Sequence, residues 1–195
     1  MHVLMPMKRF SAAKTRLREH LDDAARSALA RHMFENVLAA AVSCEQVSAS
    51  YVLTNGDDVR RVAEAAGALV LDDPAHASTS LGALIDWGLA ALYERGVRRV
   101  IVVMADLPQL RSADLSELCH SLTQHALVVT PDRRGRSTNA LGLHLPFPAP
   151  TAFGDPDSYA RHLATARALS LSWCELHNPR VAHDVDLGED LSLSP

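Results

Sequence analysis

The sequence is poor in cysteine and aromatic residues, and each shortage argues against a class of protein. Its three cysteines in 195 residues are widely spaced and form no Cys-x-x-Cys pair, so we expect reduced, buried thiols rather than a disulfide-stapled secreted fold. Aromatic residues make up 5% of the chain and the net charge is -4. Both values argue against a nucleic-acid-binding protein and favour small-molecule partners.

Long apolar runs and the common nucleotide-binding fingerprints are also missing. No apolar run approaches the ~20 residues of a membrane span. Lys8 and Arg9 follow the opening apolar stretch, which reverses the order found in a signal peptide, so we expect a cytoplasmic protein. The chain has neither Gly-x-x-x-x-Gly-Lys-Ser/Thr nor Gly-x-Gly-x-x-Gly. Any phosphate site must therefore be built in another way.

Apolar runs of strand length alternate with amphipathic stretches. This alternation predicts an α/β fold with three layers around a mostly parallel central sheet. No repeat or linker divides the chain, so we expect one domain over residues 1–195. The expected strands are 2–5, 47–53, 68–71, 97–104, 126–130 and 139–145. The expected helices are 24–42, 57–66, 81–94, one capped by Ser112, and 158–169.

A group of cations follows the first expected strand. It contains Lys8, Arg9, Lys14 and Arg16, and it holds both lysines among the 19 basic residues of the chain. In an open parallel sheet, ligands bind outside the carboxyl ends of the strands, so these cations could form a polyphosphate cradle. A solvated basic turn is an equally weighted alternative.

Three aspartates occupy places suited to a hard cation. Asp106 ends a buried apolar strand just before Leu107-Pro108, and such a carboxylate can hold Mg2+ bridged to substrate phosphates. In an extended segment Asp184 and Asp186 would project to the same side, with Val185 packed behind them. The alternatives are a turn-capping Asp106 and a solvated Asp-x-Asp strand end.

Two loops late in the chain are suited to an anion. The run 131–139 combines arginines, including Arg136, with hydroxyl side chains and a glycine. Gly154, with Ser158 at the start of the following helix, offers a second anion site by the logic of helix termini. Each could equally be a surface loop.

Taken together, these segments resemble the 2-phospho-L-lactate guanylyltransferase family of coenzyme F-420 biosynthesis, over nearly the whole chain. No single motif is specific, but their order and spacing are. The segments that carry the resemblance are Met5-Pro6-Met7-Lys8, Ala13-Lys14-Thr15-Arg16-Leu17, Ala105-Asp106-Leu107-Pro108, Thr138-Asn139-Ala140-Leu141, Phe153-Gly154 with Ser158 and His162, and Asp184-Val185-Asp186 leading into Glu189-Asp190-Leu191.

The resemblance implies a Rossmann-like fold of the nucleotide-diphospho-sugar transferase type and a Mg2+-dependent nucleotidyltransferase. Such an enzyme joins GMP from GTP to the phosphate of 2-phospho-L-lactate, phosphoenolpyruvate or 3-phosphoglycerate and releases pyrophosphate. GTP and a small phosphorylated acid would be its partners, and a homodimer is compatible with it. Two alternatives stay open: a nucleotidyltransferase of this fold with a sugar-phosphate or molybdopterin acceptor, and a non-catalytic nucleotide-binding regulator.

The resemblance also implies roles for individual residues. Lys8, Lys14 and Arg16 would hold the GTP phosphates, and Lys8, Lys14 and Asp106 would be catalytic. Asp106, Asp184 and Asp186 would bind one or two Mg2+. Thr138, Gly154 and Ser158 would seat the acceptor, together with Arg136.

The sequence departs from the family pattern at two places that matter for specificity. Ser80-Leu81-Gly82 stands where Gly-Leu-Asn is frequent, so a side chain that would help to hold the nucleoside is missing. Arg136 stands where the family usually has a small residue, and the turn at Gly154 is one residue longer before Ser158. We expect the extra cation to favour a larger or more anionic acceptor, such as 3-phosphoglycerate.

Overall fold

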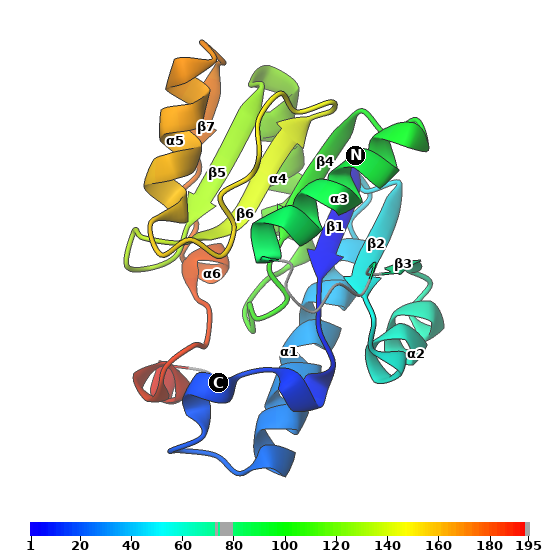
Figure 1. Cartoon of the computed structure of the whole chain (residues 1–195), viewed down its shortest axis with the longest axis vertical. Coiled ribbons are helices and arrows are strands. Elements are labelled where there is room, and N and C mark those ends of the chain that lie inside the picture. Colours follow the sequence, from blue (N-terminus) through cyan, green and yellow to red (C-terminus); the bar gives the residue numbers. More distant parts are fainter. Residues whose placement is uncertain (73, 75–79, 194–195) are drawn as a thin grey trace.

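The computed structural model, which describes residues 1–72, 74 and 80–193, shows a sheet between two helical layers (Figure 1). Within these residues seven strands form the sheet, in the order β3-β2-β1-β4-β6-β5-β7. The strands are β1 (His2–Pro6), β2 (Ala49–Thr54), β3 (Leu69–Asp72), β4 (Arg99–Val103), β5 (Leu127–Pro131), β6 (Thr138–His144) and β7 (Trp173–Glu175). The three-layer α/β fold predicted from the sequence is confirmed.

The helices divide between the two faces of the sheet. The first face carries α1 (Asp23–Val42), α2 (Asp57–Ala65), α4 (Ser112–Gln124) and α6 (Pro179–Ala182), and the second carries α3 (Leu81–Glu94) and α5 (Ser158–Ala168) (Figure 1). Successive strand residues serve opposite faces: Val3 and Met5 pack in the first core and Leu4 in the second. Both faces of β1 are therefore buried, as expected for a central parallel strand.

One strand runs against its neighbours. β6 pairs antiparallel with both β4 and β5, whereas β1 pairs parallel with β2 and β4. The connection from β5 to β6 spans only residues 132–137, which is too short for a parallel crossover. The start of β6 therefore lies at the same sheet edge as the end of β4, where Met104 N donates to Asn139 O at 2.9 Å.

The structure corrects the expected start of α4. Ser112 is its first residue and not its cap; Arg111 stands at the cap position, and its backbone N donates to the Asp114 carboxylate at 2.9 Å. The short elements β7 and α6 were not predicted, because neither has enough residues to show a hydrophobic period. In the described ranges, no helix is long and apolar enough to cross a membrane.

The Asp114 carboxylate joins α4 to α6 from a position that is only 1% exposed. It also accepts hydrogen bonds from Asn178 Nδ2 and Arg180 Nε, each at 2.9 Å. Burial by itself would raise the pKa of Asp114, but these donors outweigh it and lower that pKa below the ordinary carboxyl value. An ionised Asp114 thus anchors the segment that leads to Asp184.

Asp114→Asn is expected to lower the free energy of unfolding by about 2 kcal/mol, because hydrogen bonds to a buried charged group are lost. Chemical denaturation at pH 7 measures this change. Asp72→Asn is the matched control: Asp72 pairs with Arg60 at the surface, and its loss should leave the denaturation midpoint unchanged. Equal effects of the two substitutions would contradict the assignment.

Candidate active site

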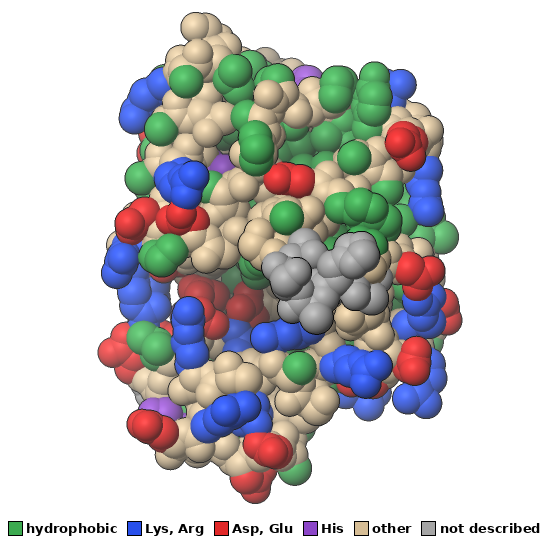
Figure 2. Space-filling model, in the orientation of Figure 1, with side chains coloured by type: hydrophobic (Ala, Val, Ile, Leu, Met, Phe, Trp, Pro, Cys, Tyr) green, Lys and Arg blue, Asp and Glu red, His purple; other side chains and the backbone are tan. Residues whose placement is uncertain are grey.

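A cavity of about 830 Å³ opens at the sheet edge where β1 and β4 end. Figure 2 shows it as a hollow with acidic and basic side chains gathered inside. From β1 the chain passes through α1 to β2 on one side, while β4 lies on the other, so the cavity sits where the strand order switches. All ten site residues named from the sequence line it: Lys8, Lys14, Arg16, Asp106, Arg136, Thr138, Gly154, Ser158, Asp184 and Asp186.

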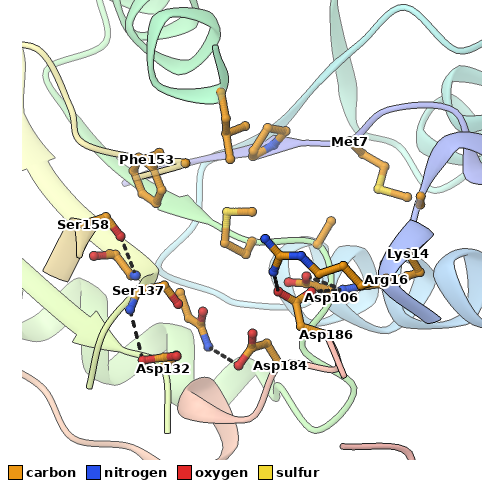
Figure 3. A pocket seen from close by; sticks show the side chains of 18 of the residues that line it. Met7, Lys14, Arg16, Asp106, Asp132, Ser137, Phe153, Ser158, Asp184 and Asp186 are labelled. Atoms are coloured by element: carbon orange, nitrogen blue, oxygen red, sulfur yellow. Dashed lines mark hydrogen bonds and ion pairs between the residues drawn. The ribbon is translucent and has the colours of Figure 1, made fainter. Parts of the chain in front are cut away.

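The Lys14 ammonium is buried between two of the predicted aspartates. Its Nζ lies 2.6 Å from Asp106 Oδ2 and 3.0 Å from Asp186 Oδ1, and the Lys14 side chain is 8% exposed. Burial would lower the pKa of Lys14, but the two carboxylates outweigh burial and raise it, so the ammonium stays charged. Arg16 Nη1 extends this pairing to Asp186 Oδ2 at 3.1 Å (Figure 3).

The third predicted aspartate belongs to the same charged group. Burial raises the pKa of Asp184 to about 6, and the neighbouring charges of Asp106 and Asp186 add to this rise. Asn139 Nδ2 lies 3.4 Å from Asp184 Oδ1 and 3.0 Å from the Val181 carbonyl oxygen, to which it also donates. The three carboxylates therefore lie close enough to interact electrostatically.

Val185 packs behind the aspartates as the sequence predicts. Its side chain is fully buried in a small cluster with Leu17 and Met33. This contact ties the segment between Asp184 and Asp186 to the short 3-10 helix Thr15–Leu17 and to α1. The two carboxylates on either side of Val185 are thereby directed toward the cavity.

The carboxylate group has the chemistry that a hard divalent cation requires. Asp106 Oδ1 is buried and has no hydrogen-bond partner among the described residues. An orphaned buried oxygen beside two further carboxylates fits the all-oxygen ligand set that Mg2+ takes. In the arrangement described for residues 1–72, 74 and 80–193, no three acidic, His or Cys side chains are already grouped as metal ligands. The Lys14 ammonium supplies the positive charge between Asp106 and Asp186.

The opposite wall of the cavity is polar but uncharged at its base. Thr138 and Ser158 are 3% and 2% exposed, and Thr138 N donates to Ser158 Oγ at 3.0 Å. Gly154 has a φ of +87°, a conformation that favours glycine. Arg136 lies at the rim, where its Nη2 is 3.3 Å from Asp157 Oδ1. Figure 3 shows Ser158, Ser137 and Asp132 facing Lys14, Asp106 and Asp186 across the cavity.

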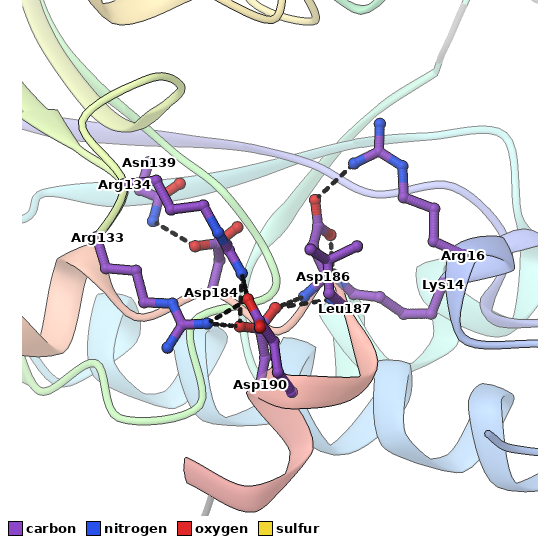
Figure 4. Close-up of polar contacts among 10 residues, drawn as sticks. Lys14, Arg16, Arg133, Arg134, Asn139, Asp184, Asp186, Leu187 and Asp190 are labelled. Carbon is purple, nitrogen blue, oxygen red and sulfur yellow. Dashed lines mark hydrogen bonds and ion pairs between the residues drawn. The ribbon is translucent and has the colours of Figure 1, made fainter.

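Two acidic residues shape the walls, although the sequence analysis gave neither of them a role of its own. Asp132 accepts from Arg136 N at 2.7 Å and from Ser137 N at 3.1 Å, which holds the loop before β6. Asp190, fully buried, accepts from Asp186 N at 2.9 Å and Leu187 N at 2.7 Å (Figure 4). The spacing Asp-x-Asp-x-x-x-Asp in the sequence points to Asp190. It does not show which groups the Asp190 carboxylate binds.

Asp190 also joins the two walls of the cavity. It forms ion pairs with Arg133 and Arg134, which follow β5, while its other hydrogen bonds hold the backbone beside Asp186. Burial would raise the pKa of Asp190, but the backbone donors and the two arginines outweigh it and lower that pKa. The ionised carboxylate thus connects the loop 132–137 to the C-terminal segment (Figure 4).

The structure gives a packing reason for the unusual glycine at position 82. A Cβ built on Gly82 would lie 3.0 Å from the Phe153 carbonyl oxygen and 3.1 Å from that of Thr151. The backbone of residues 151–153 thus packs directly on the start of α3. A side chain of the size of Asn would not fit there without moving that backbone.

Solved structures that share this fold include a nucleotide-diphospho-sugar transferase, a cytidylyltransferase and a glucosyl-3-phosphoglycerate synthase. A nucleotide-diphospho-sugar transferase from Desulfovibrio desulfuricans G20 superposes with a TM-score of 0.79 at 17% identity, covering 98% of this chain and 84% of that one. Glucosyl-3-phosphoglycerate synthase from Mycobacterium tuberculosis, solved with Mg2+ and uridine diphosphate, gives a TM-score of 0.65 at 17% identity, covering 90% and 68%. At this identity the likeness shows the fold alone.

Similarity in sequence shows the family as well as the fold. The phosphoenolpyruvate guanylyltransferase of Conexibacter woesei is 38% identical, covering 96% of this chain and 84% of that protein. The 3-phospho-D-glycerate guanylyltransferase of Phenylobacterium zucineum is 35% identical, covering 91% and 82%. Residues 1–193 match the family described as guanylyl transferase CofC like. The resemblance predicted from the sequence is confirmed: the chain belongs to the CofC-like guanylyl transferase family.

Proposed function

We propose that this protein is a guanylyltransferase that joins the GMP part of GTP to a small phosphorylated acid and releases pyrophosphate, in coenzyme F-420 biosynthesis. The observation that carries the proposal is the meeting of all ten candidate residues around one cavity. Membership of the CofC-like family, with relatives named as guanylyltransferases, supports it. Residues 1–195 would act as one catalytic domain in the cytoplasm.

The reaction requires positioning and charge neutralisation more than covalent help. An oxygen of the acceptor phosphate attacks the α-phosphorus of GTP, and the bond from that phosphorus to the oxygen bridging to the β-phosphorus breaks. The leaving electron pair departs with pyrophosphate. The acceptor phosphate is already anionic near pH 7, so no general base is needed. Lys8, Lys14 and Arg16, on the wall after β1, would hold the triphosphate and stabilise the charge that develops on it.

The three aspartates would hold a divalent cation, for which we propose Mg2+. The unpartnered buried Asp106 Oδ1 and the clustered carboxylates of Asp184 and Asp186 support this role. A cation there would neutralise phosphate charge during transfer. Lys14 keeps Asp106 and Asp186 compensated.

Thr138, Gly154, Ser158 and Arg136, on the opposite wall, would bind the acceptor acid. Relatives named for phosphoenolpyruvate and for 3-phospho-D-glycerate are similarly identical to this chain, at 38% and 35%. Overall identity therefore does not indicate which acid this protein uses, and we assign the selection of the acceptor acid to side chains at the rim of the cavity. The Arg136 side chain, which is 63% exposed and forms an ion pair only with Asp157 among the described residues, could turn toward a more anionic acid.

The proposal is tested by incubating the purified protein and Mg2+ with each nucleoside triphosphate and each of the three phospho-acids. Mass spectrometry of the products should show a guanylylated acid together with pyrophosphate. Parallel reactions contain a sugar phosphate or a molybdopterin as the acceptor. Transfer only in those reactions, or tight GTP binding with no product in any reaction, would overturn the proposal.

Asp106→Asn should reduce turnover by at least about 100-fold, because it removes one charge from the cation-binding group at unchanged side-chain volume. Steady-state kinetics and thermal denaturation measure the two effects, and the melting temperature should stay near that of the wild type. Asp57→Asn, at an exposed position on α2 outside the cavity, is the matched control. Near-normal rates for Asp106→Asn would refute the assignment.

Arg136→Ala should raise the KM for 3-phosphoglycerate several-fold more than the KM for phosphoenolpyruvate, because it removes a rim cation. A reaction that contains both acids in competition measures the preference between 3-phosphoglycerate and phosphoenolpyruvate directly. Arg31→Ala, at an exposed ion pair on α1, controls for the loss of a surface arginine. An unaltered preference would show that Arg136 does not select the acceptor.

A further inference from the structure

The hydroxyl groups of Thr138 and Ser158 are both on the wall proposed for the acceptor. A hydroxyl donates one hydrogen bond and accepts others, so its value to an anion depends on where its proton points. Ser158 Oγ accepts from Thr138 N at 3.0 Å. The Ser158 proton is therefore directed away from Thr138 N. The direction of the Thr138 hydroxyl proton depends on a buried histidine that contacts Thr138.

His162 of α5 lies behind this wall and is 1% exposed. Its Nε2 is 2.9 Å from Ala152 N, and its Nδ1 is 2.9 Å from Thr138 Oγ1. A backbone N–H can only donate, so Nε2 must accept and carries no proton. Burial, with a smaller contribution from Arg161, lowers the pKa of His162 to about 4. The ring is therefore neutral near pH 7, with its single proton on Nδ1.

This tautomer decides the direction of the second bond. Nδ1–H donates to Thr138 Oγ1, so the Thr138 hydroxyl is an acceptor toward His162 and its own proton must point elsewhere. The Thr138 and Ser158 oxygens each use a lone pair on an N–H group of the protein. Both protons remain to be donated, and both residues line the cavity.

His162 also positions the backbone of the same wall. Its bond to Ala152 N holds the segment that leads to Gly154, and the Phe153 and His162 rings form a T-shaped pair with centroids 5.2 Å apart. Thr138 on β6, Ala152 and Phe153 thus all contact one imidazole.

We propose that His162 is a positioning residue that sets the Thr138 hydroxyl as a hydrogen-bond donor and, together with the Thr138–Ser158 contact, leaves both hydroxyl groups as donors for the phosphate of the acceptor acid. The identity of the ligand rests on the proposed function. A histidine that served only to pack the core would affect folding but not the acceptor in particular.

Two amide substitutions separate the bonds of His162. His162→Gln places an amide oxygen near the position of Nε2, which can still accept from Ala152 N, but it lacks the donor toward Thr138. His162→Asn places an amide NH2 near the position of Nδ1 and keeps that donor. We expect His162→Gln to raise the KM for phosphoenolpyruvate about tenfold with the KM for GTP within twofold. His162→Asn should stay within about threefold of the wild type for both substrates.

Thr138→Val completes a double-mutant cycle, because it removes the hydroxyl at similar volume. In the Thr138→Val background, His162→Gln should cause no further rise in the acceptor KM. Additive effects, equal effects on both substrates, or an unchanged acceptor KM in His162→Gln would overturn the role. If His162→Gln does not fold, an unaltered acceptor KM in Thr138→Val would overturn it instead.

The experiment distinguishes this inference from the proposed function. A wild-type protein that consumes no GTP with any of the three phospho-acids refutes the proposed function. Normal wild-type turnover together with an unaltered His162→Gln variant refutes only the role of His162.

Discussion

The buried ammonium of Lys14 is the interaction on which the rest of the site depends. It contacts Asp106, 92 residues away in the chain, and Asp186, 172 residues away. A buried lysine is costly without partners, and so are clustered carboxylates without a cation. The Lys14 ammonium and the two carboxylates therefore offset each other's cost of burial. Together they hold the turn after β1, the segment after β4 and the C-terminal segment around one cavity.

The backbone conformation of Lys14 also helps to place its side chain between the two aspartates. Its φ of 52° is left-handed, which is uncommon for a residue with a Cβ, and Lys14 lies between the 3-10 helices Phe10–Ala12 and Thr15–Leu17. Such a conformation persists only where surrounding contacts stabilise it. The paired carboxylates and the packing of Leu17 against Val185 provide those contacts.

A second charged centre, Asp190 with Arg133 and Arg134, connects the other side of the cavity to the same C-terminal segment. The antiparallel strand β6 makes this possible, because it returns Thr138 and Asn139 to the edge where β1 and β4 end. The site thus has a charged wall suited to a triphosphate and a cation, and an opposite wall rich in hydrogen-bond donors. A nucleotidyl transfer between two phosphate-bearing substrates needs both.

The elements with a clear hydrophobic period could be predicted to within one or two residues, as α3 (Leu81–Glu94) and β1 (His2–Pro6) show. The candidate residues were also found from the sequence, because strand ends and Asp-x-Asp spacing have a fixed geometric meaning. The helix cap at position 112 was wrong, because the buried Asp114 partners Arg111 N through contacts that no local pattern records. The helix α6 was not predicted, because its four residues are too few to show a hydrophobic period.

The sequence by itself determined the three-layer fold, the family and the residue types that gather at the sheet edge, since these follow from local periodicity and from motif order. Only the tertiary structure decided which charges neutralise one another, that Gly82 is packed against backbone, and that the buried His162 carries its proton on Nδ1. The physical reason is that charge compensation, close packing and hydrogen-bond direction depend on distances between residues far apart in the chain. Those distances exist only once the sheet has formed.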